Sequence, residues 1–110
     1  MSAPLNLSVV VPLYNEEESL PHLVKQLISA LRPTDEAFEL VLVDDGSSDR
    51  TAKVLAQLSA EVPEVVAVLL RKNYGQTAAM AAGFDVAGGE VIVSLDGDPV
   101  SYTHLRAHET

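Results

Sequence analysis

Polar side chains that can bind ligands follow each of four short apolar runs in the sequence. They are Tyr14-Asn15-Glu16, Asp44-Asp45, Arg71-Lys72-Asn73-Tyr74 and Asp96-Gly97-Asp98. Four carboxylates brought together from two of these places would repel one another unless a cation lay between them. Mg²⁺ and Mn²⁺ prefer oxygen ligands and are often shared between carboxylates and phosphates. The pattern therefore favours a divalent metal site, although any one of these Asp residues alone is also typical of a turn.

The four apolar runs alternate with segments that have a helical pattern. Strands are predicted over residues 7–13, 38–43, 65–70 and 91–95, and helices over about 20–31, 51–60 and 75–87. Ser19 is the expected N-cap of the first helix. The order β-α-β-α-β-α-β predicts an α/β fold with a parallel, Rossmann-like sheet and helices on both faces. Ligands of such sheets lie beyond the carboxyl ends of the strands, where the polar residues above would gather.

Composition excludes several classes of protein. The chain has 110 residues, no cysteine and a net charge of −9. The missing cysteines rule out disulfides, thiolate zinc sites and thiol catalysis, and the negative charge argues against binding to duplex nucleic acid. The longest apolar run, 65–70, is far shorter than the roughly 20 residues that span a bilayer. A cytoplasmic protein is expected.

The last residues differ in character from the rest. Residues 100–110, VSYTHLRAHET, have no apolar period and match the translation of a widely used transposase sequencing adapter at all eleven positions. We therefore expect a boundary after Asp98, with 1–98 as the informative part and 99–110 as a non-native tail.

Three other phosphate-handling classes can be tested by inspection. No G-x-G-x-x-G follows the first strand, which disfavours a dinucleotide-binding dehydrogenase, and no G-x-x-x-x-G-K-[ST] is present, which excludes a P-loop NTPase. A response-regulator receiver would need an acidic pair after the first strand, where this chain has Tyr14-Asn15-Glu16.

Three stretches together resemble a known family. VVVPLYNEEESL, VLVDDGSSDRT and RKNYGQTAAMAAGFDVAGGEVIVSLDGD occur in the order and spacing of the N-terminal, nucleotide-binding half of a family-2 glycosyltransferase of the GT-A fold. The resemblance covers residues 7–98. Within the family it is strongest to dolichol-phosphate mannose synthases and bacterial polyprenyl-phosphate sugar transferases.

The resemblance implies a role for particular residues. Pro12, Tyr14 and Glu16 match the loop beside the nucleotide base and ribose, and Asp45, with Asp44 alongside, matches the acid that contacts the base. Asp96, Gly97 and Asp98 match the D-x-D motif, in which Asp96 and Asp98 hold Mg²⁺ or Mn²⁺ and Asp96 and Gly97 lie against the sugar diphosphate. The metal would stabilise the negative charge of the leaving nucleoside diphosphate.

The implied reaction is an inverting transfer of a sugar from a UDP- or GDP-sugar to a lipid phosphate or glycan acceptor. For the polyprenyl-phosphate branch, the resemblance places the intact parent at the cytoplasmic face of the membrane. The acceptor half that normally follows D-x-D does not appear in this sequence, so we expect the chain by itself to be inactive and to bind nucleotide weakly. The alternative is a non-catalytic α/β nucleotide-binding module.

Overall fold

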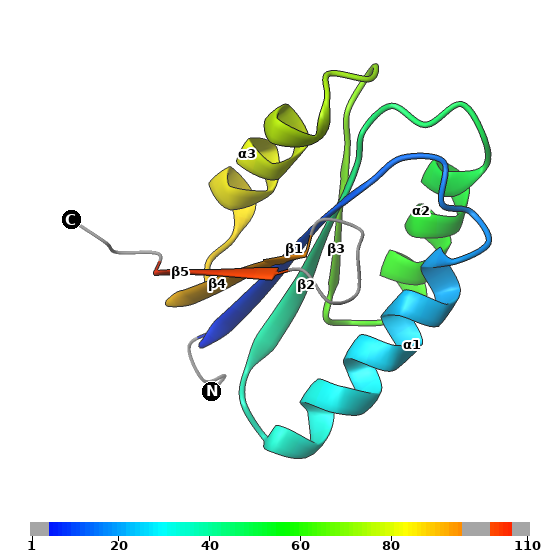
Figure 1. The fold of residues 1–110 in the computed structure, drawn as a ribbon. Coiled ribbons are helices and arrows are strands. Elements are labelled where there is room, and N and C mark those ends of the chain that lie inside the picture. Colours follow the sequence, from blue (N-terminus) through cyan, green and yellow to red (C-terminus); the bar gives the residue numbers. More distant parts are fainter. Residues whose placement is uncertain (1–4, 96–101, 107–110) are drawn as a thin grey trace.

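The computed structural model describes residues 5–95 and, for the backbone alone, residues 102–106. Its centre is one sheet with the strand order β3-β2-β1-β4-β5 (Figure 1). The strands are β1 (Leu7–Leu13), β2 (Phe38–Asp44), β3 (Val65–Leu69), β4 (Val91–Leu95) and β5 (Tyr102–Arg106). The first four are mutually parallel, as the sequence predicts, and β5 runs antiparallel to β4.

Helices cover both faces of the sheet. α1 (Leu20–Leu31) and α2 (Thr51–Glu61) lie on one side of the strands and α3 (Gln76–Val86) lies on the other (Figure 1). A short 3₁₀ helix, η1 (Arg32–Thr34), follows α1. This arrangement confirms the predicted β-α-β-α-β-α-β order, and each predicted element agrees with the observed one to within a residue at either end.

Two hydrophobic cores hold the three layers together. Alternate residues of β1 and β2 point to opposite faces, so Val9 and Leu40 pack towards α1 and α2, whereas Val10 and Val41 pack towards α3. Every residue of β2 is buried, as expected of a central strand in a parallel sheet.

Close contact between α3 and the sheet depends on one small residue. A Cβ added to Gly83 would lie 2.3 Å from Val10 Cγ1 and 3.1 Å from Val43 Cγ2. Neither distance is compatible with ordinary van der Waals contact, so α3 packs at this depth because residue 83 has no side chain.

A buried polar network joins the amino-terminal end of the sheet to the α3–β4 connection. The Ser8 hydroxyl donates to Glu39 Oε2 at 2.6 Å and accepts from the Gly89 N–H at 2.8 Å. The Gly88 N–H donates to the same Glu39 oxygen at 2.8 Å. Both side chains are buried, and the network lies at the end of the sheet opposite the predicted ligand site.

Two details correct the expectations from sequence. Ser19 does precede α1, but its side chain caps no helix N–H and donates instead to Glu16 Oε2 at 2.6 Å. β5 is a strand that the sequence pattern did not indicate. In the described part of the chain, no helix is both long enough and apolar enough to cross a bilayer.

Candidate functional site

The loop after β1 is bound to the loop after β2 by a row of hydrogen bonds. The Asn15 N–H donates to Ser47 Oγ at 2.8 Å, and the Asn15 side-chain oxygen accepts from the Ser48 N–H at 2.9 Å and from the Asp49 N–H at 3.3 Å. The next N–H, of Glu16, donates to Thr51 Oγ1 at 2.8 Å. These loops follow neighbouring parallel strands, so the contact forms at the carboxyl end of the sheet.

Asp45 binds the loop after β3. One carboxylate oxygen accepts from the Tyr74 N–H at 2.8 Å, and the other accepts from the Gly75 N–H at 3.1 Å and from Asn73 Nδ2 at 3.2 Å. Asp45 is only 3% exposed. Its carboxylate therefore sets the position of the loop that leads into α3.

The same two loops touch through their backbones at Gly46. This residue has φ +66°, a left-handed conformation that glycine adopts without steric cost. A Cβ at this position would lie 2.1 Å from the carbonyl carbon of Lys72. Both the conformation and the close approach therefore require glycine between β2 and α2.

Asp44 lies at the end of β2, paired with Leu13 of β1 and Leu69 of β3. Its Oδ2 accepts from the Ser47 N–H at 3.3 Å, while its Oδ1 is buried without a hydrogen-bond partner among the described residues. A buried carboxylate oxygen without a partner is destabilising, and such groups in folded proteins usually meet a donor, water or a cation. Asp44 therefore has spare acceptor capacity at this end of the sheet.

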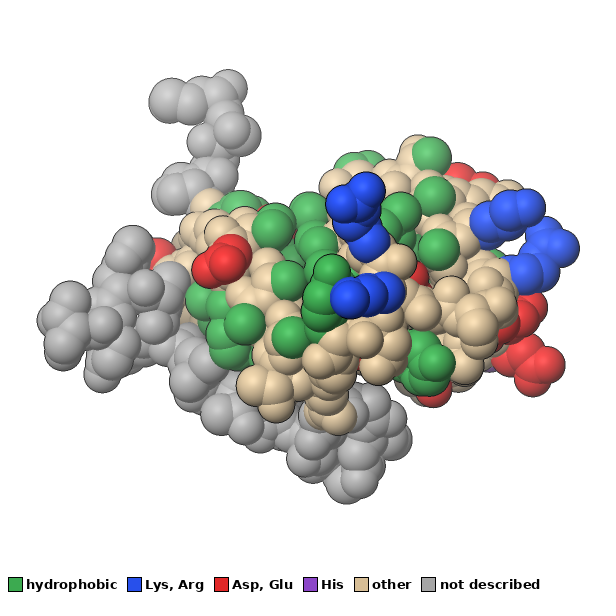
Figure 2. Space-filling model, turned by 90° about the horizontal axis from the view of Figure 1, so that it is seen from above, with side chains coloured by type: hydrophobic (Ala, Val, Ile, Leu, Met, Phe, Trp, Pro, Cys, Tyr) green, Lys and Arg blue, Asp and Glu red, His purple; other side chains and the backbone are tan. Residues whose placement is uncertain are grey.

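Aromatic and basic side chains are exposed beside these acids. Tyr14 and Tyr74 are 47% and 53% exposed, and Lys72 Nζ lies 5.3 Å from the centre of the Tyr74 ring. Figure 2 looks down on the end of the molecule that is uppermost in Figure 1, and shows Lys and Arg side chains beside hydrophobic ones near the middle of that face. An exposed ring is suited to stacking on a nucleobase, and the cations are suited to a phosphate group.

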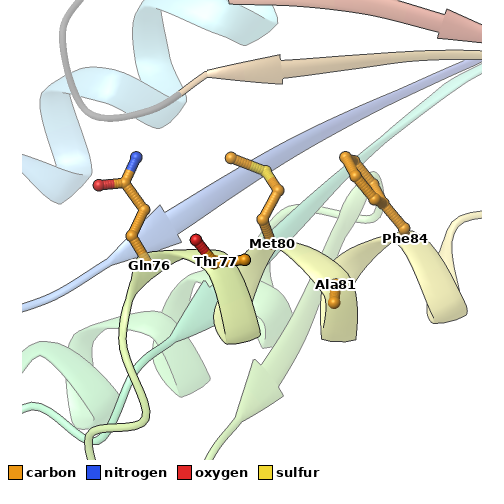
Figure 3. A pocket seen from close by; sticks show the side chains of 5 residues that line it. All are labelled: Gln76, Thr77, Met80, Ala81 and Phe84. Carbon is orange, nitrogen blue, oxygen red and sulfur yellow. The ribbon is translucent and has the colours of Figure 1, made fainter.

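A hollow of about 380 Å³ lies along α3 and begins at the end of the helix that follows Gly75. It is lined by Gln76, Thr77, Met80, Ala81 and Phe84 (Figure 3). Gln76, Met80 and Phe84 point to the same side of the helix. Met80 and Phe84 also pack against the core beneath α3, so the hollow is apolar along the helix and adjoins the polar loop cluster at Gln76 and Thr77.

Hydrogen bonding alters the acidity of one carboxyl group in the loop cluster. Partial burial acts to raise the pKa of Asp49, but hydrogen bonds from the Thr51 hydroxyl and from the N–H groups of Thr51 and Glu17 outweigh it and lower the pKa below its ordinary value. Asp49 is therefore held ionised at the start of α2, where the positive end of the helix dipole also favours a negative charge.

The structure brings three of the four predicted clusters together. Tyr14 and Glu16 follow β1, and half-buried Pro12 lies within it. Beside them, Asp44 ends β2 and Asp45 directly follows it. The fourth cluster follows β4, which lies next to β1 and ends at Leu95. Its residues, Asp96, Gly97 and Asp98, lie outside the described residues. Among residues 5–95, no group of three His, Asp or Glu side chains is arranged to hold a metal ion.

The hydrogen bonds that connect the loops were not predicted from the sequence. Asn15, Asn73 and Thr51 each form hydrogen bonds between segments about 30 residues apart. One signal was available at Asn15, because Asn in a loop is a residue type that tolerates left-handed backbone. Asn15 does have a positive φ, of 54°.

Comparison with known proteins decides the family. Residues 8–104 match the model of the family described as Glycosyl transferase family 2. The chain belongs to this family. Undecaprenyl-phosphate 4-deoxy-4-formamido-L-arabinose transferase of Pectobacterium carotovorum subsp. carotovorum is 50% identical over 95 residues, and the protein of that name from Pseudomonas paraeruginosa is 52% identical over 98 residues. These matches cover 84% and 86% of this chain, but the chain spans only 29% of each relative.

Similar solved structures confirm the GT-A-like fold. The mannosyltransferase PcManGT from Pyrobaculum calidifontis, in complex with GDP-Man and Mn²⁺, matches with a TM-score of 0.74 and 26% identity over 87% of this chain and 30% of its own. S. aureus TarS 1-349 in complex with UDP-GlcNAc matches with a TM-score of 0.72 and 29% identity, over 86% of this chain and 27% of its own. The part shared with both neighbours is the parallel sheet and its helices.

Proposed function

We propose that this chain forms the donor-binding part of an inverting glycosyltransferase that moves a sugar from a nucleoside diphosphate to a polyprenyl phosphate. The observation that carries the proposal is the joining of the loops after β1, β2 and β3 at one end of the sheet, through Asn15 and Asp45. Ligands of parallel α/β sheets bind at this end. The relatives named for undecaprenyl phosphate support the acceptor class.

The described residues at the ends of β1 and β2 are suited to binding the base and ribose. The half-exposed ring of Tyr14 supplies a stacking face for the base, with Pro12 and Glu16 on the same loop. Asp44 supplies a buried carboxylate oxygen that has no hydrogen-bond partner within residues 5–95, and Asp45 fixes the loop that carries Tyr74. We assign the base and ribose side of the nucleotide to these residues.

The diphosphate and metal are assigned to the residues that directly follow β4. A set of carboxylate oxygens suits Mg²⁺ or Mn²⁺. The Asp44 oxygen, which has no partner in the described part of the chain, supports an affinity for positive charge at this end of the sheet. Asp96 and Asp98 would hold the ion, with Gly97 between them allowing close approach of the diphosphate. When bound, the ion stabilises negative charge on the departing nucleoside diphosphate.

In the proposed reaction, an oxygen of the lipid phosphate attacks the anomeric carbon from the face opposite the leaving group. The bond from that carbon to the diphosphate oxygen breaks, and its electrons leave with the nucleoside diphosphate. A phosphate oxygen is already anionic, so this acceptor needs little help from a general base. A lipid acceptor and a nucleotide donor together place the reaction at the cytoplasmic face of a membrane.

Calorimetry tests the donor site directly. We would titrate the 110-residue chain with UDP and with GDP, each with and without Mn²⁺, and repeat the titrations with the double variant Asp96→Asn/Asp98→Asn. The proposal predicts metal-dependent binding of one nucleotide that the double variant loses. Asp35→Asn is the matched control, because Asp35 is exposed and its φ of 60° is one that Asn tolerates. Absence of binding by the folded chain would refute the donor site.

A further inference from the structure

Asn15 has more contacts across the loops than any role in its own turn requires. Its N–H donates to Ser47 Oγ, and its side-chain oxygen accepts from the N–H of Ser48, from the Ser48 hydroxyl at 3.3 Å and from the N–H of Asp49. Three of the four bonds involve backbone N–H groups. One amide side chain thus ties the end of β1 to the whole turn that leads into α2.

The backbone on either side of Tyr14 is fixed by these and neighbouring contacts. The carbonyl of Leu13 accepts from the Asp45 N–H at 2.8 Å, so residue 13 is tied to β2. Residue 15 is tied to the turn at 47–49. Tyr14 lies between the two anchors, with its ring 47% exposed. The backbone position from which this ring projects is therefore set by the contacts of its neighbours in the chain.

The conformation of Asn15 explains why this residue type is needed. Its φ of 54° is in the left-handed region, where β-branched and bulky residues are strained and Asn is tolerated. Glycine would adopt the same backbone but has no acceptor, and alanine lacks the acceptor and is strained as well. Asp combines a tolerated conformation with a side-chain oxygen in the same place.

We infer that Asn15 is a positioning residue for nucleotide recognition: it holds Tyr14 in place for the base and locks the loop after β1 onto the loop after β2. The inference rests on the proposed function, since Tyr14 is the stacking residue of that proposal. Fixing the ring before the ligand arrives removes an ordering cost from binding. Asn15 itself needs no contact with the nucleotide.

Affinity measurements on a small set of variants test this role. The titrations use UDP and GDP with Mn²⁺, at a temperature well below the melting point of every variant. Asn15→Ala and Asn15→Gly should weaken binding by about tenfold or more, and Asn15→Asp should stay within about threefold of the unchanged chain. Ser8→Ala is the control for stability alone, because it breaks the buried network at the opposite end of the sheet and should leave affinity unchanged.

A double-mutant cycle distinguishes positioning from general damage. If Asn15 acts through Tyr14, then Tyr14→Ala/Asn15→Gly binds no more weakly than Tyr14→Ala alone, because the ring that Asn15 positions is already absent. Additive losses, or equal losses for Asn15→Asp and Asn15→Gly, would overturn the inference and leave the proposed function standing. A folded unchanged chain that binds neither nucleotide would overturn both. If Asn15→Ala does not fold, the Gly and Asp variants decide the question.

Discussion

At the scale of single residues, Asp45 connects the end of β2 to the loop before α3. Both of its oxygens accept hydrogen bonds from residues 73–75, and the side chain is buried. Asp45→Asn would turn an NH₂ group towards donors that now meet an oxygen. We expect a loss of about 1–3 kcal/mol in the free energy of unfolding, measured with urea. Asp35→Asn, an exposed change of the same chemistry, should cost less than about 0.5 kcal/mol. If Asp45→Asn and Asp35→Asn lose the same free energy of unfolding, the three hydrogen bonds of Asp45 contribute little to stability.

Asp49 should make stability sensitive to acid. Because the folded state lowers the pKa of Asp49, the unfolded chain takes up its proton more readily as the pH falls. The contribution is therefore complete above the ordinary pKa of 3.8 and is lost as the pH falls through the lowered value. The Asp49→Asn variant should show a shallower acid decline of the urea midpoint, measured from about pH 7 to pH 3.

Glu64 gives a second test of the same pH dependence at the other end of the sheet. The Arg32 guanidinium, which binds Glu64 through two hydrogen bonds at 3.0 and 2.9 Å, lowers the pKa of that carboxyl. Glu64→Gln should also flatten the acid decline, but should leave nucleotide affinity unchanged at every pH. If the acid decline of Asp49→Asn equals that of the unchanged chain, Asp49 does not carry the effect.

At the scale of whole elements, the close packing of α3 against the sheet can be tested at Gly83. Gly83→Ala improves helix propensity by up to about 1 kcal/mol, but its methyl group would lie 2.3 Å from Val10 Cγ1. We expect the clash to outweigh the gain in helix propensity, so that the variant loses about 1–3 kcal/mol in the free energy of unfolding, measured with urea. Gly88→Ala is the matched control, because its methyl group would meet Leu5 at an ordinary 3.5 Å. A stabilised Gly83→Ala would mean that α3 can move away from the sheet at little cost.

The elements themselves follow from local patterns in the sequence. Apolar runs predicted β1 and β4 with the observed bounds. β1 is buried along most of its length, as expected of a strand with continuous apolar residues, whereas burial alternates along β4. β5 has no such run and was not predicted. It pairs through its backbone with β4, and backbone pairing leaves little trace in side-chain pattern.

The site was predictable only in part. Parallel topology correctly brought the loops after β1, β2 and β3 to one end of the sheet. The contacts within that cluster were not predictable, because they join residues far apart in the chain. Asp45 accepts hydrogen bonds from residues 28 to 30 positions later, and Asn15 accepts them from residues 33 and 34 positions later. Ser19 was predicted to cap α1, but its hydroxyl donates a hydrogen bond to the nearby Glu16 carboxylate instead.

At the scale of the whole molecule, net charge should set how nucleotide binding responds to salt. The chain carries a net charge of −9, and a nucleoside diphosphate is also an anion. Without a divalent cation, the two repel each other over a distance that shrinks from about 20 Å or more at low salt to about 8 Å near physiological ionic strength. We therefore expect metal-free affinity for UDP or GDP to rise as NaCl is increased from about 0.02 to 0.15 M.

Removing charge near the site should reproduce the effect of salt. In the absence of metal, Asp96→Asn/Asp98→Asn should bind the nucleotide more tightly than the unchanged chain and respond less to NaCl, since two of the repelling charges are gone. With Mn²⁺ the order should reverse, because the same carboxylates then hold the ion. Calorimetric titrations across the salt series measure the affinity without metal and the affinity with Mn²⁺. A metal-free affinity that falls as salt rises would instead show that local cations such as Arg71 and Lys72 outweigh the net charge, and the carboxylates would then have no repulsive part in nucleotide binding.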